Sequence, residues 1–196
     1  MSGRLPGAVS GVDGLPRCPW ATGGADYLAY HDEEWGRVVH GDDRLFERLC
    51  LEAFQSGLSW LTILRKREAF RRAFQGFSIP AVAAFGDEDV SRLRSDPGIV
   101  RNERKIEAAI GNARAALSIP GGLDALVWSY APDTPRPAPV TLDDVPSSTA
   151  ASSALAGALK KRGFRFVGPT TVYALMQACG LVDDHVTGCH IRGQPS

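Results

Sequence analysis

Apolar residues recur with helical spacing along most of this chain, and this periodicity restricts its fold more than any other feature. In residues 42–56, Leu45, Phe46 and Leu49 lie on one helical face behind an Asp-rich start suited to capping, and Gly57 ends the run. The same reasoning predicts further helices over residues 58–75, 87–94 and 101–118.

Two more helices are predicted beyond a proline-rich loop. The segment APDTPRPAPVTLDDVP, residues 131–146, contains too many prolines for regular structure. Ser147 or Ser148 can then cap a helix that stops at Gly163, and a last helix is expected within residues 168–180. Because no hairpin signal and no βαβ alternation interrupts this series, the sequence predicts an all-α fold.

The length of 196 residues and a hydrophobic content of 44% suit one globular domain. We expect residues 1–17, which are rich in Gly and Pro and lack periodicity, to form a disordered or loosely attached tail, residues 18–190 to form the domain, and residues 191–196 a second tail. No apolar run reaches the roughly 18 residues of a membrane-spanning helix, and the start lacks the apolar core of a signal peptide. We therefore predict a cytoplasmic protein without a membrane partner, and no obligatory protein partner is evident.

The charges give no general sign of a nucleic-acid partner, because 22 basic and 22 acidic residues cancel. Any DNA-binding surface must therefore be local, although basic clusters are also typical of solvated helix faces. The candidates are Arg65, Lys66, Arg67, Arg71 and Arg72; Arg101, Arg104 and Lys105; and Lys160, Lys161, Arg162 and Arg165.

The four cysteines fall into two pairs. Cys50 and Cys179 lie within apolar helical patterns, where a cysteine usually packs as a small hydrophobic residue. Cys18 and Cys189 lie near the chain ends among polar residues and turn formers, each with a histidine within reach along the chain. Without a secretory signal, disulfides are a poor explanation for this second pair.

Two thiolates and two imidazoles near the chain ends predict a metal site. The candidate ligands are Cys18, His31, His185 and Cys189. Such a set is typical of a closed, tetrahedral structural zinc site, and here it would join the two ends of the chain. His185 and Cys189, four residues apart, would face the same way on a helical turn. From spacing alone the match is only suggestive, since His40 and His190 are nearby competitors.

A glycine turn precedes the last predicted helix. The segment GFRFVGPTTVYALMQACGLVDDHV resembles the helix-hairpin-helix element of the DNA glycosylase superfamily. Gly168 would let the backbone approach a ligand closely, and the amides of Thr170 and Thr171 at a positive helix end can hold a DNA phosphate. An ordinary helix-turn-helix packing unit would show the same pattern.

A single acid, Glu52, lies in an apolar helical stretch, and aromatic residues precede and follow it along the chain. These aromatics are Tyr27, Tyr30, Trp35 and Trp60. A pocket for a flipped, electron-poor base needs stacking walls and a hydrogen-bond acceptor, which these residues supply. The alternative is a helical glutamate that simply points into solvent.

Together, the motifs CPWA, YHDEEWG, LEAFQSGLSW, RKREAFRRAF, GNARA and KKRGFRFVGPTT resemble the 3-methyladenine DNA glycosylase I family, from Cys18 to Cys189. The resemblance implies a helix-hairpin-helix glycosylase fold and hydrolysis of the N-glycosidic bond of 3-methyladenine in alkylated double-stranded DNA. It also implies Glu52 as the catalytic acid, base binding by the four aromatics, and one structural zinc ion held by the four Cys and His ligands.

The resemblance also bears on the reaction and on a second acid. The hairpin carries no lysine at the nucleophile position of the superfamily, so we expect a monofunctional enzyme without a Schiff-base step that cleaves the strand. Asp183 stands where the family usually has asparagine and where other members of the superfamily carry a catalytic aspartate. Because Asp183 adjoins His185, we favour a structural role for it and rank it behind Glu52.

Two alternative functions were weighed. A zinc hydrolase is disfavoured because four protein ligands leave no position for a metal-bound water. A non-catalytic DNA-binding module would need only the hairpin and the basic clusters, and the pocket of aromatics and one acid argues against it.

Overall fold

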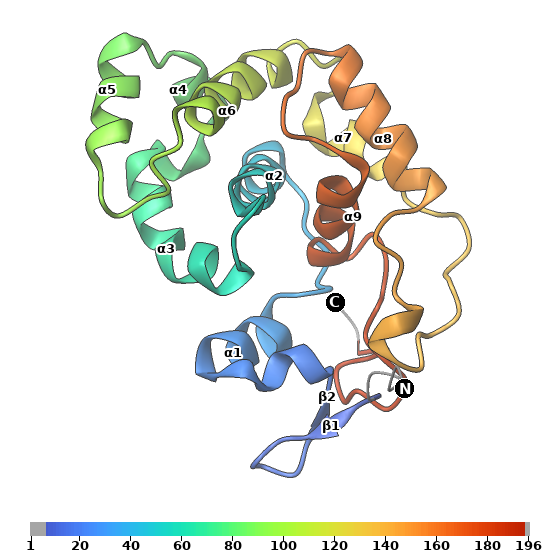
Figure 1. Ribbon diagram of the computed structural model, residues 1–196. Coiled ribbons are helices and arrows are strands. Elements are labelled where there is room, and N and C mark those ends of the chain that lie inside the picture. Colours follow the sequence, from blue (N-terminus) through green and yellow to red (C-terminus); the bar gives the residue numbers. More distant parts are fainter. Residues whose placement is uncertain (1–6, 195–196) are drawn as a thin grey trace.

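The computed structural model describes residues 7–194, and this part of the chain is mostly helical, as the sequence predicts (Figure 1). In chain order the elements are β1 (Val9–Ser10), β2 (Pro16–Arg17), the 3₁₀ helix η1 (Pro19–Gly23), α1 (Ala25–Glu33), α2 (Asp42–Gln55), α3 (Trp60–Ala73), η2 (Gln75–Phe77), α4 (Ile79–Ala83), α5 (Asp87–Ser95), α6 (Glu103–Ala116), α7 (Gly122–Trp128), η3 (Leu142–Asp144), α8 (Ala150–Lys161) and α9 (Pro169–Ala178). Among residues 7–194, no helix is both long enough and apolar enough to cross a bilayer.

Helix α2 lies at the centre of the molecule and packs against α3, α6, α7 and α9 (Figure 1). Every residue from Leu49 to Phe54 is buried, so the second half of α2 is enclosed on all sides. A helix that is apolar all round is stable only when other elements surround it. The sequence of α2 therefore brings Glu52 into the interior instead of into solvent.

A buried lysine holds the end of α2. Lys105 on α6 donates from Nζ to the carbonyl oxygens of Phe54 and Ser56, at 2.9 and 2.6 Å. The last carbonyls of a helix have no partner within the helix, so this contact satisfies groups that would otherwise be buried unpaired. It also fixes the turn from α2 to α3, between Glu52 and Trp60.

Helices α8 and α9 pack against each other and are joined by residues 162–168. Helix α8 begins one residue later than the expected cap at Ser147 or Ser148. Thr149 caps it instead, since Ser152 N donates to Thr149 Oγ1 and Thr149 N donates to Ser152 Oγ. This reciprocal pair satisfies two amides together, which a single serine cap would not do.

Residues 7–17 form a hairpin, which corrects the prediction of a loose tail over this stretch. Strands β1 and β2 pair antiparallel, and Arg17 is almost completely buried between the carboxylates of Asp13 and Asp32. His190 N donates to Pro16 O at 2.8 Å and attaches the hairpin to the C-terminal segment. Long-range charge pairing thus orders a stretch whose composition suggests disorder. Residues 1–6 and 195–196 of the two expected tails lie outside the described part of the chain.

Two glycines allow the segment after α1 to pass close to the end of α9. Gly36 has φ +81°, and a Cβ atom there would lie 2.9 Å from Nε2 of His185. Gly180 has φ +75°, and its Cβ atom would lie 2.8 Å from the backbone of Arg37. Both the left-handed conformation and the close approach require glycine.

Candidate functional site

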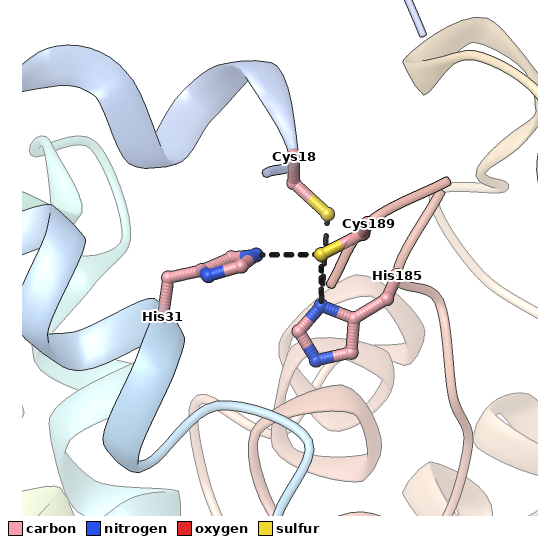
Figure 2. Close-up of side chains that lie close together, drawn as sticks. All are labelled: Cys18, His31, His185 and Cys189. Carbon is pink, nitrogen blue, oxygen red and sulfur yellow. Dashed lines mark hydrogen bonds between the residues drawn. The ribbon is translucent and has the colours of Figure 1, made fainter. Parts of the chain in front are cut away.

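Four buried side chains from the two ends of the chain converge on one point (Figure 2). They are Cys18, His31, His185 and Cys189, and their ligand atoms all lie within 4.8 Å of one another. Sγ of Cys189 is 3.4 Å from Nε2 of His31 and 3.6 Å from Nδ1 of His185, and Sγ of Cys18 is 3.6 Å from the same Nδ1. The four residues predicted from the sequence are thus brought together, in a group that could hold a metal ion.

Hydrogen bonds on their far sides fix the orientation of both imidazoles. Nδ1 of His31 contacts Oδ1 of Asp32 at 2.8 Å, and Nε2 of His185 contacts the carbonyl oxygen of Trp35 at 3.3 Å. Since both partners are acceptors, each of these nitrogens carries the proton, and the other nitrogen presents its lone pair to the sulfurs. Metal-binding histidines in proteins usually have this arrangement.

The structure corrects one step in the prediction of this cluster. His185 and Cys189 do not lie on a helical turn; they belong to an irregular segment with a turn at residues 187–188. The amide of Cys189 donates to Val186 O, and this turn brings its sulfur back beside His185. The competing histidines lie outside the cluster: His40 pairs with Asp124 at the surface, and His190 contacts Asp32.

The two sulfurs of the cluster are electrostatically coupled. Their mutual hydrogen bond, with contacts from both imidazoles, lowers the pKa of Cys189 well below its usual range. The same sulfur pair and burial raise the pKa of Cys18. One thiolate therefore forms easily here, and a thiolate is the form of cysteine that binds metals.

Beside this cluster lies a cavity of about 440 Å³. It is lined by Trp20, Tyr27, Tyr30, Trp35, Glu52, Gln55, Trp60, Leu142, Val145, Ala174, Gln177 and Asp184. All five pocket residues predicted from the sequence are among them, and their roles remain predictions. The sequence reasoning missed Trp20, for which proximity to Cys18 in CPWA was the available signal, and it missed Gln177 and Asp184.

Glu52 is a buried acid that accepts no hydrogen bond from the described part of the chain. Burial raises the pKa of its carboxyl to about 8, against a smaller opposing effect of Arg48, one helical turn earlier. Arg48 is itself held by Glu34, with Nη2 at 2.8 Å from Oε2. Glu52 can therefore change its protonation state near neutral pH, when a charge enters the cavity.

Aromatic rings connect the cavity wall with the Cys/His cluster. Trp20 and Trp35 meet edge to face with centroids 5.0 Å apart, and both contact ligand rings, Trp20 that of His31 at 5.1 Å and Trp35 that of His185 at 4.6 Å. Further along the wall, Leu61 N donates to the hydroxyl of Tyr27 at 3.2 Å. The cluster therefore supports two of the rings that line the cavity.

The acid that enters the cavity after α9 is Asp184 and not its neighbour. Asp183 is 43% exposed and accepts from the amide of His185, which agrees with the structural role favoured for it. The side chain of Asp184 is 1% exposed and lines the cavity. In this irregular segment neighbouring side chains point to different sides, and the sequence pattern does not reveal which of two adjacent aspartates points inward.

The turn before α9 is open on its outer side. Gly168 has φ −70°, and a Cβ atom there would meet nothing within 4 Å, so neither its conformation nor its packing requires glycine. The amides of Thr170 and Thr171 belong to the first turn of α9, where helix amides have no partner within the helix.

The basic clusters differ in how free their charges are. Arg65, Arg67 and Arg71 are paired with acids, and Lys105 is buried, so most of these charges serve the fold. In the described part of the chain, Lys160 and Lys161 at the end of α8 form no ion pair. These two cations lie at the end of α8 from which residues 162–168 lead to α9.

Comparisons with known proteins agree on one relationship. The family model described as "Methyladenine glycosylase" matches residues 20–192. The DNA-3-methyladenine glycosylase 1 of Escherichia coli strain K12 is 50% identical over 179 residues, which cover 89% of this chain and 96% of the relative. A crystal structure of 3-methyladenine DNA glycosylase I is 49% identical, with a TM-score of 0.85 and coverage of 89% of this chain and 98% of that one. A tyrosine-to-phenylalanine variant of such an enzyme, in complex with 3-methyladenine, is 34% identical with a TM-score of 0.86, covering 92% and 99%.

Proposed function

The chain belongs to the methyladenine glycosylase family, and from this premise we infer that it is a DNA repair glycosylase that releases 3-methyladenine from alkylated double-stranded DNA. The observation that carries this inference is the cavity, in which the buried acids Glu52 and Asp184 stand among aromatic rings. An enzyme that acts on a single base must extrude it from the duplex into a pocket of this kind.

The chemistry needs few catalytic groups. Methylation at N3 gives the purine a positive charge, and breaking the bond to C1′ lets the base depart as a neutral molecule. The rings of Tyr27, Tyr30, Trp35 and Trp60 would stack against the base and favour its charge by cation–π contact. A water molecule then adds at C1′ and loses a proton to solvent, which completes the hydrolysis. With no lysine at the nucleophile position of the superfamily to form a Schiff base, the reaction stops at the abasic site.

Glu52 would recognise the charge on the lesion. In the empty cavity burial favours the neutral carboxyl, because its pKa is about 8. A cationic base in the cavity favours the carboxylate, so Glu52 loses its proton when the lesion enters. A normal, uncharged base does not provide this compensation, so Glu52 keeps its proton and the base gains no ion pair with it.

The Cys/His cluster would hold one structural zinc ion. A tetrahedral Zn²⁺ with ordinary Zn–S and Zn–N bonds places sulfur and nitrogen ligands about 3.5 Å apart, and three of the four S···N pairs are 3.4, 3.6 and 3.6 Å apart. Four protein ligands leave no position for a reacting water, so the ion would join the chain ends and support the tryptophan wall without taking part in hydrolysis.

The turn between α8 and α9 would bind the DNA backbone as a helix-hairpin-helix element. The open space at Gly168 lets a phosphate approach the amides of Thr170 and Thr171, where the positive end of α9 favours an anion. Lys160 and Lys161 would add charge on the same side. A cytoplasmic location remains a prediction from the sequence.

Base release tests the proposed function. Purified protein is incubated with methylated duplex DNA, and the released bases are identified by chromatography. We expect free 3-methyladenine and an intact, abasic strand. Binding of the DNA without any released base would instead identify a non-catalytic module.

A further inference from the structure

Gln177 and Asp184 line the same cavity as Glu52, and no step of the proposed reaction uses them. Gln177 lies on α9, and Asp184 follows in the irregular segment. Both oxygens of the buried Asp184 carboxyl are occupied: Oδ1 contacts Arg136 Nη1 at 3.2 Å, and Oδ2 contacts Tyr173 Oη at 2.5 Å and Gln177 Nε2 at 2.9 Å.

The donor and acceptor roles of these groups determine where the protons of the network lie. A guanidinium can only donate, and Arg136 Nη1 also lies 2.9 Å from Tyr173 Oη, so the phenol oxygen accepts there. The proton of Tyr173 must then point to Asp184. Burial and this hydrogen bond raise the pKa of Tyr173, so the phenol keeps its proton. The two oxygens of Asp184 therefore accept from Arg136 and from Tyr173.

The carboxyl group of Asp184 beside Gln177 decides which way the amide faces. Oδ2 already accepts from Tyr173, so Gln177 turns its NH₂ group toward this oxygen, since the opposite rotamer would place two oxygens in contact. Oε1 of Gln177 accepts from no donor in the described part of the chain. The cavity wall thus carries a hydrogen-bond acceptor whose orientation is set from behind.

We propose that Oε1 of Gln177 is a specificity-determining acceptor for the exocyclic amino group at ring position 6 of the adenine lesion, with Asp184 as the positioning residue that fixes its direction. This rests on the proposed function of the cavity. Adenine carries a donor at position 6, whereas guanine carries a carbonyl oxygen there. With 3-methylguanine, Oε1 of Gln177 would face the carbonyl oxygen at position 6, and both oxygens would be buried without a donor. The cavity therefore binds 3-methyladenine better than 3-methylguanine.

The network also predicts the effect of Asp184→Asn. Arg136, Tyr173 and Gln177 all donate to the carboxyl group, and an amide offers them only one acceptor oxygen. In either rotamer the new NH₂ group faces at least one of these donors, so the hydrogen bonds that hold the direction of Gln177 are disturbed. We therefore expect this variant to discriminate less between the two bases.

The test compares the binding of free 3-methyladenine and free 3-methylguanine, measured through the fluorescence of the tryptophans that line the cavity. The proteins are the wild type, Gln177→Leu, Asp184→Asn and the matched control Asp183→Asn, whose side chain is exposed and does not line the cavity. Metal content and thermal melting are recorded for each.

We expect Gln177→Leu to bind 3-methyladenine roughly fivefold to tenfold more weakly, with a smaller change for 3-methylguanine, and Asp184→Asn to show a smaller preference for 3-methyladenine than the wild type. Asp183→Asn should keep the wild-type ratio. An unchanged ratio of the two affinities in Gln177→Leu would overturn the proposal. Because Gln177 is only half-buried, Gln177→Leu should fold, and it tests the proposal if Asp184→Asn does not fold. A wild type that neither binds a methylated purine nor releases one from DNA would refute the proposed function itself.

Discussion

Replacing Glu52 with Gln is the most informative single change, because it keeps the shape of the side chain and removes its charge. The carboxyl is buried, and its pKa is raised from 4.5 to about 8. Since each pKa unit corresponds to about 1.4 kcal/mol, ionising Glu52 in the folded protein costs about 5 kcal/mol more than in water. In the lesion complex, the contact between the Glu52 carboxylate and the cationic base offsets this cost.

Two results follow for Glu52→Gln. A hydrogen bond to a charged group is worth about 1.5–3 kcal/mol, so the rate of base release should fall by about tenfold to a hundredfold. The second result concerns the pH dependence of the free energy of unfolding, which should differ between the wild type and Glu52→Gln. The raised pKa of Glu52 stabilises the wild type fully below pH 4.5, and this contribution is lost as the pH rises toward 8. The glutamine variant lacks this loss and should gain stability relative to the wild type between these pH values.

The assay is single-turnover release of 3-methyladenine from methylated duplex DNA, together with denaturant unfolding of both proteins at pH 5 and pH 8. Metal content serves as the control for folding, and Asp183→Asn is the matched acid-to-amide variant, expected to cost little because the amide can still accept from His185 N. If Asp183→Asn were inactive and Glu52→Gln nearly normal, or if the two stability curves ran parallel, the assignment of Glu52 would fall.

Three further predictions concern the metal and the DNA. Removing the metal should lower the melting temperature and also change tryptophan fluorescence, because Trp20 and Trp35 contact the ligand rings; identical melting with and without a chelator would refute the structural role. Arg17→Met should speed zinc release to a chromogenic chelator about tenfold to a hundredfold, since Arg17 holds Asp32 against His31; an unchanged rate would exclude this support. Gly168→Val, which the fold accommodates, should weaken binding of damaged and undamaged duplex alike in a filter or fluorescence assay; loss confined to damaged DNA would place Gly168 in the base pocket.

Helices α2, α3, α5, α6, α8 and α9 follow from local sequence patterns, whereas α1, α4 and α7 lie outside the predicted ranges. The period of Leu45, Phe46 and Leu49 is sufficient for α2, and a glycine or proline marks the ends of several other helices. Cys50 and Cys179 lie in the core as their apolar surroundings indicate. The Cys/His cluster is different, because a local pattern carries no information about contacts between distant chain ends. The spacing only suggests the cluster, and the family resemblance supports it.

The remaining features depend on long-range contacts. Arg17 orders the N-terminal hairpin through Asp32, 15 residues away, and no local pattern announces this pair. The choice between Asp183 and Asp184 depends on how an irregular segment turns after α9. Glu52 is buried because other elements pack around α2, so the pattern of apolar residues in this helix alone does not show whether the Glu52 side chain faces the core or solvent.

The proposed function requires above all that the cavity between Glu52 and the aromatic rings receives the excised base. A crystal structure of the metal-loaded protein with 3-methyladenine tests this claim most directly. We predict that the base stacks against the aromatic side chains, with Glu52 within hydrogen-bond distance of its edge, and that a single ion is bound by Cys18, His31, His185 and Cys189. A base bound elsewhere on the protein, with the cavity filled only by water, would contradict the account.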